Sequence, residues 1–165
     1  MALNLEVPQH SLSLPKMRTL HYMYEVKKMS KMVMLVKSGN YTDFMTATMI
    51  ASGAIANDME VEIFFMNDAV WALKKENYMH NTTVHSNFPE FANTIADSLN
   101  EGKIKPWWEL MADLKEFGDI KLTVCALVAE LGNLHKEDFM DLIDDLAGVA
   151  YFTGQAEDAD VVLTI

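Results

Sequence analysis

A single cysteine, Cys125, is the residue best suited to nucleophilic chemistry in this sequence of 165 residues. It follows an apolar run at residues 122–124, which predicts a buried strand, and precedes a predicted helix at residues 126–131 that ends at Gly132. Ligands of parallel α/β folds bind at the carboxyl ends of the strands, so we expect Cys125 at that edge. Unpaired N–H groups at a helix start favour the thiolate form. A free cysteine is also common as a small buried hydrophobe, and both interpretations stay open.

Other side chains are predicted to lie near the same edge of the sheet. They are Gly39 and several polar or aromatic residues that follow a predicted strand or lie on a nearby helix, namely Ser38, Asn40, Asn67, Asp68, Trp71 and Trp108. The turn at residues 38–40 could present N–H groups to an anion, and either residue 67 or residue 68 is expected to cap the next helix. The sequence contains neither a Gly-rich phosphate loop nor a dinucleotide fingerprint, so we expect no nucleotide cofactor.

The histidines and aspartates do not form a recognisable metal-binding pattern. His80 and His85 are five residues apart in a polar stretch, and no second cysteine is present to complete a zinc site. Asp141, Asp144 and Asp145 are expected on the solvated face of a helix, at a spacing that does not match a calcium loop. We therefore expect no bound metal and no cofactor.

Composition excludes several classes of partner. Thirteen basic and 24 acidic residues give a net charge of −11, which argues against nucleic acid and against an anionic membrane surface. No apolar run approaches the roughly 20 residues that a membrane-spanning helix needs. One cysteine fits a reducing cytoplasm, and the N-terminus shows no signal-peptide pattern.

The elements that position these residues alternate between strand and helix. Apolar runs at residues 32–36, 61–65, 122–124 and 161–165, with a brief strand at 147–149, predict five strands. Helices are predicted from Thr42 to about residue 57, from residue 70, over residues 136–146 and over residues 150–159. This alternation predicts a three-layer α/β/α fold with a mostly parallel, five-stranded sheet.

The prediction for domains is a lead-in at residues 1–28 and a single domain at residues 29–165. Residues 17–28 are expected to form a short amphipathic helix in the lead-in. Residues 76–105 are expected to be an insertion over the sheet edge, with a helix that begins near Pro89 and ends at Gly102. A further helix is expected to begin at Pro106 and end at Gly118, with Trp108 off its apolar face.

Four segments, in order, resemble the DsrE/DsrF-like sulfur-relay family. They are residues 32–57, residues 61–70 (Val-Glu-Ile-Phe-Phe-Met-Asn-Asp-Ala-Val), residues 122–125 (Leu-Thr-Val-Cys), and the closing residues 156–165. The sequence is most similar to the larger single-chain members, which also have an insertion before a Trp-containing helix. Ala69 stands where the family usually has Gly, and the lead-in has no counterpart.

The resemblance implies a homo-oligomer in which Cys125 takes sulfane sulfur as a persulfide and passes it to a partner thiol. The implied partners are a small sulfur-carrier protein or a low-molecular-weight sulfane donor, and the activity would be that of a sulfurtransferase-like carrier. A second hypothesis is a non-catalytic oligomeric binding or scaffold module of the same fold with an inert Cys125. A third is a thiol enzyme such as a peroxide-reducing protein, whose oxidised cysteine would need an external thiol.

Overall fold

The computed structural model describes residues 29–82, 84 and 86–165. The predicted lead-in and its helix at residues 17–28 lie outside these described residues, as does His85.

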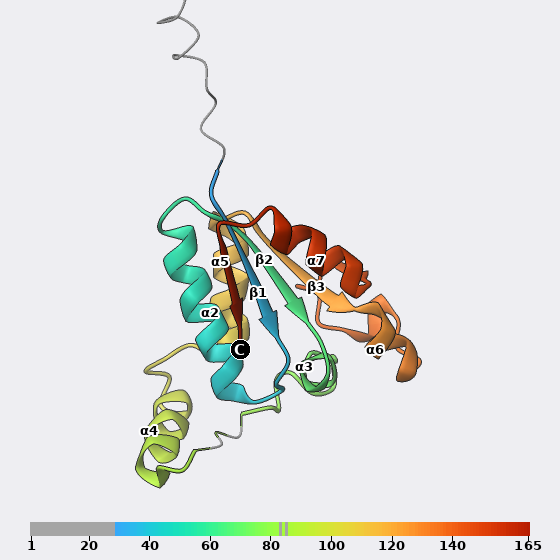
Figure 1. Ribbon diagram of the computed structural model, residues 1–165. Helices are drawn as coiled ribbons and strands as arrows, with labels where there is room; N and C mark the ends of the chain where they lie inside the picture. The colour runs from blue at the N-terminus through green and yellow to red at the C-terminus, as the bar shows by residue number, and fades with distance from the viewer. Residues whose placement is uncertain (1–28, 83, 85) are drawn as a thin grey trace, which may run out of the picture.

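A five-stranded parallel sheet forms the centre of the fold, as the sequence predicted (Figure 1). Its strands lie in the order β4-β3-β2-β1-β5, so the chain moves across the sheet from β1 to β4 and then returns to the other side of β1. Apolar side chains fill both faces of the inner strands because helices lie above and below them. The strands are β1 (Lys31–Val36), β2 (Glu60–Phe65), β3 (Ile120–Cys125), β4 (Asp145–Ala147) and β5 (Val161–Thr164).

Helices cover both faces of the sheet and complete the predicted three layers (Figure 1). On one face α2 (Tyr41–Ile55) packs beside α5 (Trp107–Phe117), and Phe44 stacks between Phe65 and Trp107 at centroid distances of 5.8 and 4.5 Å. On the other face α7 (Val149–Glu157) lies over the sheet, and the ring of Phe152 packs against that of Phe64 in a tilted arrangement with a centroid distance of 5.4 Å. Two short helices, α3 (Asp68–Ala72) and α6 (Ala126–Leu131), follow β2 and β3 at the carboxyl edge.

The helix α4 (Pro89–Asn100) projects from the body of the molecule (Figure 1). It begins at Pro89 as predicted, and none of its residues is buried. Phe88 and Phe91 are exposed at its start, whereas Ile95 and Leu99 are half-buried against the core. The helix α5 begins directly after Pro106 and ends at Gly118, also as predicted.

The predicted helix over residues 136–146 is wrong. A single 3-10 turn (η1, Lys136–Asp138) is followed by irregular chain and then by β4, which lies two residues before the predicted brief strand. The backbone instead pairs with the segment after α3, because Met140 N–H donates to the Leu73 carbonyl at 3.0 Å. The carboxylate of Asp144 accepts from Leu122 N–H at 2.8 Å and pairs with Lys115, so this aspartate anchors β4 rather than facing solvent on a helix.

The predicted helix starts also need correction at two points. Asn40, rather than Thr42, is the N-cap residue of α2, and Thr42 lies within the helix. Asn67 occupies the N-cap position of α3, but neither it nor Asp68 caps the helix with a side-chain hydrogen bond.

Candidate functional site

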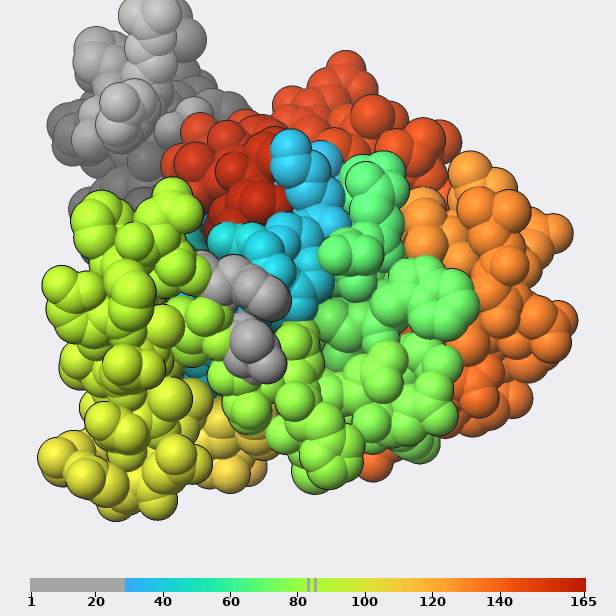
Figure 2. Space-filling model, turned by 90° about the horizontal axis from the view of Figure 1, so that it is seen from below, coloured from blue at the N-terminus to red at the C-terminus, as the bar shows by residue number. Residues whose placement is uncertain are grey.

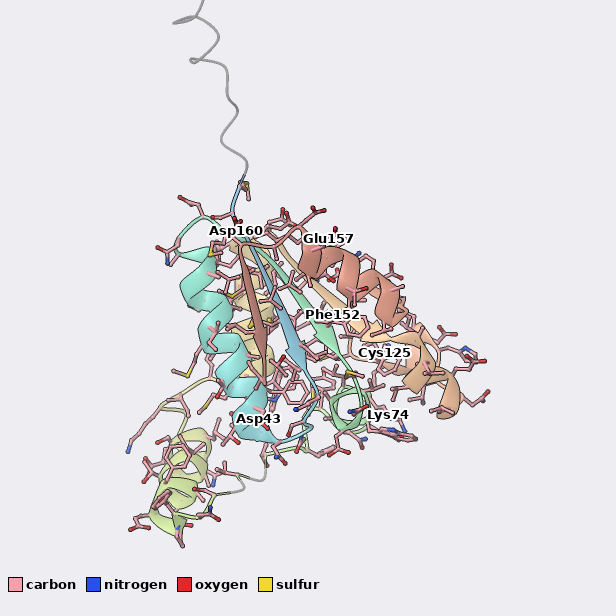
Figure 3. All side chains as sticks on the ribbon, viewed as in Figure 1. Asp43, Lys74, Cys125, Phe152, Glu157 and Asp160 are labelled. Atoms are coloured by element: carbon pink, nitrogen blue, oxygen red, sulfur yellow. The ribbon has the colours of Figure 1, made fainter. Side chains whose placement is uncertain are left out.

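Cys125 is the last residue of β3 and the N-cap residue of α6, at the carboxyl edge of the sheet (Figure 3). This is the predicted place, and α6 has the predicted bounds with Gly132 as its C-cap. At such a sheet edge a reactive cysteine is expected to be partly accessible, and this expectation is wrong here, because Cys125 is 3% exposed and belongs to the apolar core. The α6 helix has six residues, and Cys125 makes no side-chain capping bond to it. The thiol therefore lies at the sheet edge where ligands of such folds bind, but it is buried and not accessible to solvent.

The turn after β1 lies against the start of α3, which brings several predicted residues together. A Cβ atom on Gly39 would lie 2.9 Å from the Asp68 carbonyl oxygen, so a glycine is required there for the two segments to touch. Ala69 N–H donates to the Lys37 carbonyl at 3.4 Å, and Ser38 Oγ accepts from Asn40 N–H at 3.2 Å.

A hollow of about 340 Å³ lies beside this contact, at the carboxyl edge shown in Figure 2. Three residues of its walls, Gly39, Asp68 and Trp71, were predicted from the sequence to lie at this edge. The other residues of the walls are Ala72, Asn77, His80 and Asn81. Asn81 Nδ2 donates to the Gly39 carbonyl at 2.5 Å, and Asn77 Nδ2 donates to the Trp71 carbonyl at 2.8 Å. These amides hold residues 77–81 over the strand ends. From the sequence this segment could be described only as polar, so the role of the Asn77 and Asn81 amides was not predicted.

Trp71 connects this hollow to the helix that follows Cys125. Its ring is half exposed, and a Cβ atom on Gly132 would lie 3.1 Å from Trp71 Cζ2. The end of α6 therefore rests against the indole of α3. Trp108 lies in a different place, in a hollow of about 220 Å³ with Met140 and Leu142, where its ring meets that of Tyr78 edge-on at 6.0 Å.

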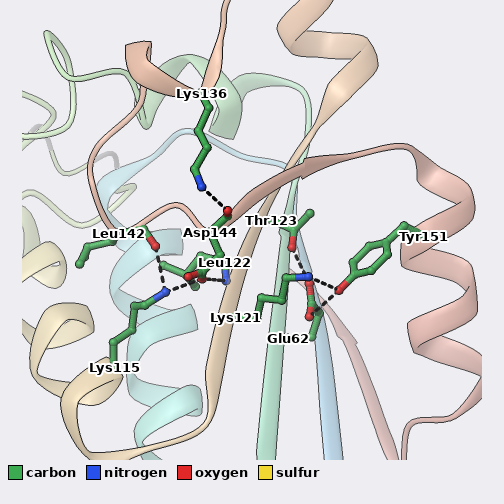
Figure 4. Close-up of polar contacts among 9 residues, drawn as sticks. All are labelled: Glu62, Lys115, Lys121, Leu122, Thr123, Lys136, Leu142, Asp144 and Tyr151. Carbon is green, nitrogen blue, oxygen red and sulfur yellow. Dashed lines mark hydrogen bonds and ion pairs between the residues drawn. The ribbon is translucent and has the colours of Figure 1, made fainter.

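A buried polar network lies on the same face of β3 as Cys125, because side chains two residues apart on a strand share a face. Glu62 of β2 is 2% exposed, and its Oε1 accepts from Thr123 Oγ1 at 2.6 Å (Figure 4). Its Oε2 accepts from the Tyr151 hydroxyl at 3.0 Å, and Lys121 Nζ donates to that hydroxyl at 2.9 Å. The network joins α7 to β2 and β3. The sequence showed Glu62 only as an interruption in an apolar strand.

Burial and hydrogen bonding shift the pKa values of two groups in this network, Glu62 and Lys121. Desolvation raises the pKa of Glu62, and the bonds from Thr123 and Tyr151, with the charges of Lys121 and Lys31, oppose that rise. The hydrogen bond with Tyr151 raises the pKa of Lys121. Two hydroxyl groups donate hydrogen bonds to the Glu62 carboxyl group, which is typical of a structural network. None of these hydrogen bonds involves the Cys125 thiol.

The described residues contain no cluster of three or more histidine, cysteine or carboxylate side chains that could hold a metal ion. Within the same residues, no helix combines the length and apolar character needed to cross a membrane.

A family model described as the DsrE/DsrF-like family matches residues 30–165. The chain belongs to the DsrE/DsrF-like family. Among solved structures, this DsrE/DsrF-like chain is similar to a protein of unknown function from Methanobacterium thermoautotrophicum, with a TM-score of 0.55 and 9% sequence identity. The match covers 82% of this chain and 99% of that one, and at this identity it shows a shared fold. No curated protein matches the sequence.

Proposed function

We propose that this DsrE/DsrF-like protein is a sulfur carrier that holds sulfane sulfur on Cys125. In the first step the Cys125 thiolate attacks the outer sulfur of a donor persulfide, a new S–S bond forms, and the donor thiolate leaves and takes a proton. In the second step a partner thiolate attacks the outer sulfur of the Cys125 persulfide, and the Cys125 thiolate leaves. Neither step needs a metal, a cofactor or a net oxidant.

The place of the chain's one cysteine supports this proposal most directly. Cys125 ends a central strand of a parallel sheet in a DsrE/DsrF-like chain, at the edge where such folds bind their ligands. With no second cysteine in the sequence, an internal disulfide cannot release the sulfur, so an external thiol must accept it. The donor and acceptor would be a low-molecular-weight persulfide or a small sulfur-carrier protein, in a reducing cytoplasm.

Burial of the thiol adds a requirement to this chemistry. At 3% exposure the sulfur is out of reach of a partner, so the carboxyl edge must open locally before either step. The short helix α6 begins directly after Cys125, and Gly132 at its end lies against Trp71, so we infer that this helix and its contact must move when the edge opens. We expect Trp71→Ala to speed loading of Cys125 by loosening this contact.

The second candidate is a scaffold of the same fold with an inert Cys125, and the burial of the thiol among core residues is the observation in its favour. One experiment separates the two. The native protein is incubated with a polysulfide, and intact mass is measured alongside Cys125→Ser. A sulfur carrier gains whole sulfur atoms that the variant does not gain and that a small thiol removes.

Alkylation provides the matched control for that measurement. If native Cys125 resists both polysulfide and a small alkylating reagent, yet reacts fully in urea, the thiol is a core residue and the scaffold function replaces the carrier function. If the Cys125→Ser variant gains the same mass as the native protein, the added sulfur is not on Cys125.

A further inference from the structure

One face of the sheet is incompletely covered by the described helices. On the face that carries α2 and α5, the helix α2 contacts both β1 and β2. On the opposite face α7 lies over β2 and β3, because Phe152 packs against Phe64 of β2 and the Tyr151 hydroxyl accepts a hydrogen bond from Lys121 of β3. The short helix α6 contacts β3 and β4. No described helix packs closely on the β5 side of this second face.

Side-chain exposure marks the uncovered strip. Leu35 of β1 shares the α7 face with Phe64, its partner in register, and Thr164 of β5 is the partner of Leu35 on the other side. Thr164 and Val162 are exposed, and Leu35 is half-buried although β1 is an inner strand. The inner strands of a parallel sheet are normally covered on both faces, so one covering element is missing here.

The side of α7 that faces β5 continues this strip. Tyr151 faces β3, and Phe152, about 100° further round the helix, faces β2, so the side beyond Phe152 faces β5. Helical spacing places Val149, Thr153 and Ala156 on that side, and none of them is charged. Val149 is 55% exposed and Thr153 is exposed as well. We call the β5 surface the set of residues Leu35, Val149, Thr153, Ala156, Val162 and Thr164.

The chain enters β1 from a segment whose sequence suits the β5 surface. Residues 17–28 lie outside the described residues, and their sequence predicts a helix with Leu20, Met23 and Tyr24 at helical spacing. A helix of twelve residues is about 18 Å long, and a strand of six residues such as β1 is about 20 Å long. Only two residues separate the segment from Lys31, where β1 begins. So short a connection is typical of a helix that lies antiparallel to its strand, on one face of the sheet.

We propose that residues 17–28 pack as a helix on the β5 surface of their own chain. The apolar side of this helix then covers Leu35 and Val162, beside α7. The opposite face of β1 already carries α2, so the face with the β5 surface is the open one. A helix there completes the layer that α7 begins, and it buries the strip that the described helices leave exposed. The proposal holds whether or not Cys125 transfers sulfur.

Net charge favours the chain's own N-terminal segment at this surface. Residues 1–28 contain four basic and two acidic residues, a net charge of +2, whereas residues 29–165 contain nine basic and 22 acidic residues, a net charge of −13. The segment and the domain therefore attract each other, while a second copy of the whole chain, with a net charge of −11, is repelled.

Acidic side chains also lie where this segment joins the domain. Glu157 ends α7, Asp160 directly precedes β5, and Figure 3 places both at the end of the molecule where β1 begins. The Asp160 carboxylate accepts from Lys31 N–H at 2.8 Å. Lys27 and Lys28 end the predicted helix, where cations interact favourably with the helix dipole, and the short connection keeps them near these carboxylates.

The test is hydrogen–deuterium exchange of the full chain, read by mass spectrometry over residues 17–28. An isolated helix of this length is marginal in water, so slow exchange reports packing on the domain. We expect these amides to exchange at least about tenfold more slowly than in an unfolded peptide. Val162→Lys places a cation on the β5 surface and should abolish this protection, because β5 is an edge strand that tolerates Lys while the basic segment is repelled. Met49→Lys, at a 62% exposed position between α2 and α5, is the matched control and should keep the protection.

A variant of the segment itself repeats the test from the other side. Leu20→Asp places a carboxylate on the apolar side of the predicted helix and should abolish the protection of residues 17–28 as Val162→Lys does. Circular dichroism checks that each variant keeps the fold, and Leu20→Asp decides the test if Val162→Lys does not fold.

Mixing the two variants shows which chain the segment covers. The mixture contains an intact segment and an intact β5 surface only on different chains, so we expect no recovery of protection. Recovered protection would show packing between copies and overturn the proposal. Two other results would also overturn it: a native segment that exchanges as fast as an unfolded peptide, and protection that Met49→Lys abolishes while Val162→Lys keeps it.

Discussion

The hydroxyl of Thr123 gives the sharpest prediction for the buried network. Thr123→Val keeps the side-chain shape and removes the donor that lies 2.6 Å from Glu62 Oε1. A hydrogen bond to a charged group contributes about 1.5–3 kcal/mol to stability, and one to a neutral group about 0.5–1.5 kcal/mol. The variant should therefore lose about 1–1.5 kcal/mol more when Glu62 is ionised than when it is protonated. That difference corresponds to a further rise in the pKa of Glu62 in the variant.

The sign of the pH dependence follows from the direction of the shift. Burial raises the folded-state pKa of Glu62 above its unfolded value, so the folded state binds the proton more tightly. The contribution of Glu62 to the free energy of unfolding is therefore most favourable below the unfolded pKa, and it falls as pH rises through the folded pKa. Thr123→Val should steepen this fall and extend it to higher pH.

Urea unfolding followed by circular dichroism, at several pH values between about 4 and 8, measures this dependence. Thr123→Ser is the matched control, because it keeps the hydroxyl and loses only a methyl group, so its loss of stability should not change with pH. Equal and pH-independent losses for the two variants would refute the assignment of an ionisable Glu62 bonded to Thr123.

Two further predictions concern the carboxyl edge and the β4 anchor. Gly39→Ala should lower the free energy of unfolding by about 1–3 kcal/mol, since its Cβ would meet the Asp68 carbonyl, whereas Gly53→Ala, with open space inside α2, should raise it by up to about 1 kcal/mol. Urea unfolding of both variants checks this pair, and a loss of equal size at both positions would contradict it. Asp144→Asn should cost about 1–2 kcal/mol and speed hydrogen exchange at Leu122 N–H, because the charged acceptor of that amide is lost. Unchanged exchange at that amide would show that the side chain does not hold β4 in place.

The strands and the position of Cys125 could be predicted because the signals are local. Each inner strand is a short apolar run, and the chain around Cys125 contains both a strand end and a helix end at Gly132. The depth of Cys125 could not be predicted, because burial depends on segments that are distant in sequence. The same reason explains the missed amides of Asn77 and Asn81, which reach a wall of the hollow only after residues 77–81 fold back over the strand ends.

The error over residues 136–146 has a different cause. Apolar residues at helical spacing also occur in irregular chain whose side chains fill the core at intervals, as Phe139, Met140 and Ile143 do here. The backbone bond from Met140 to Leu73 and the Asp144 anchor are tertiary contacts, and together they outweigh a weak helical preference. Trp108 was correctly separated from the apolar face of its helix, but its hollow is formed by this irregular segment and lies apart from the one beside Gly39.

The pairing of β1 with β5 has a consequence for how the chain acquires its structure. Lys31 N–H donates to the Asp160 carboxylate, 129 residues away in the sequence. The strands β1 and β5 pair in parallel along their length. Contacts so distant in sequence form slowly, because a long loop must close before any of them is made. During synthesis β1 can pair with β2 early, yet its other edge stays open until residues 161–164 have emerged. Among the described strands, β1 is therefore the one whose open edge is exposed longest to pairing with the wrong partner.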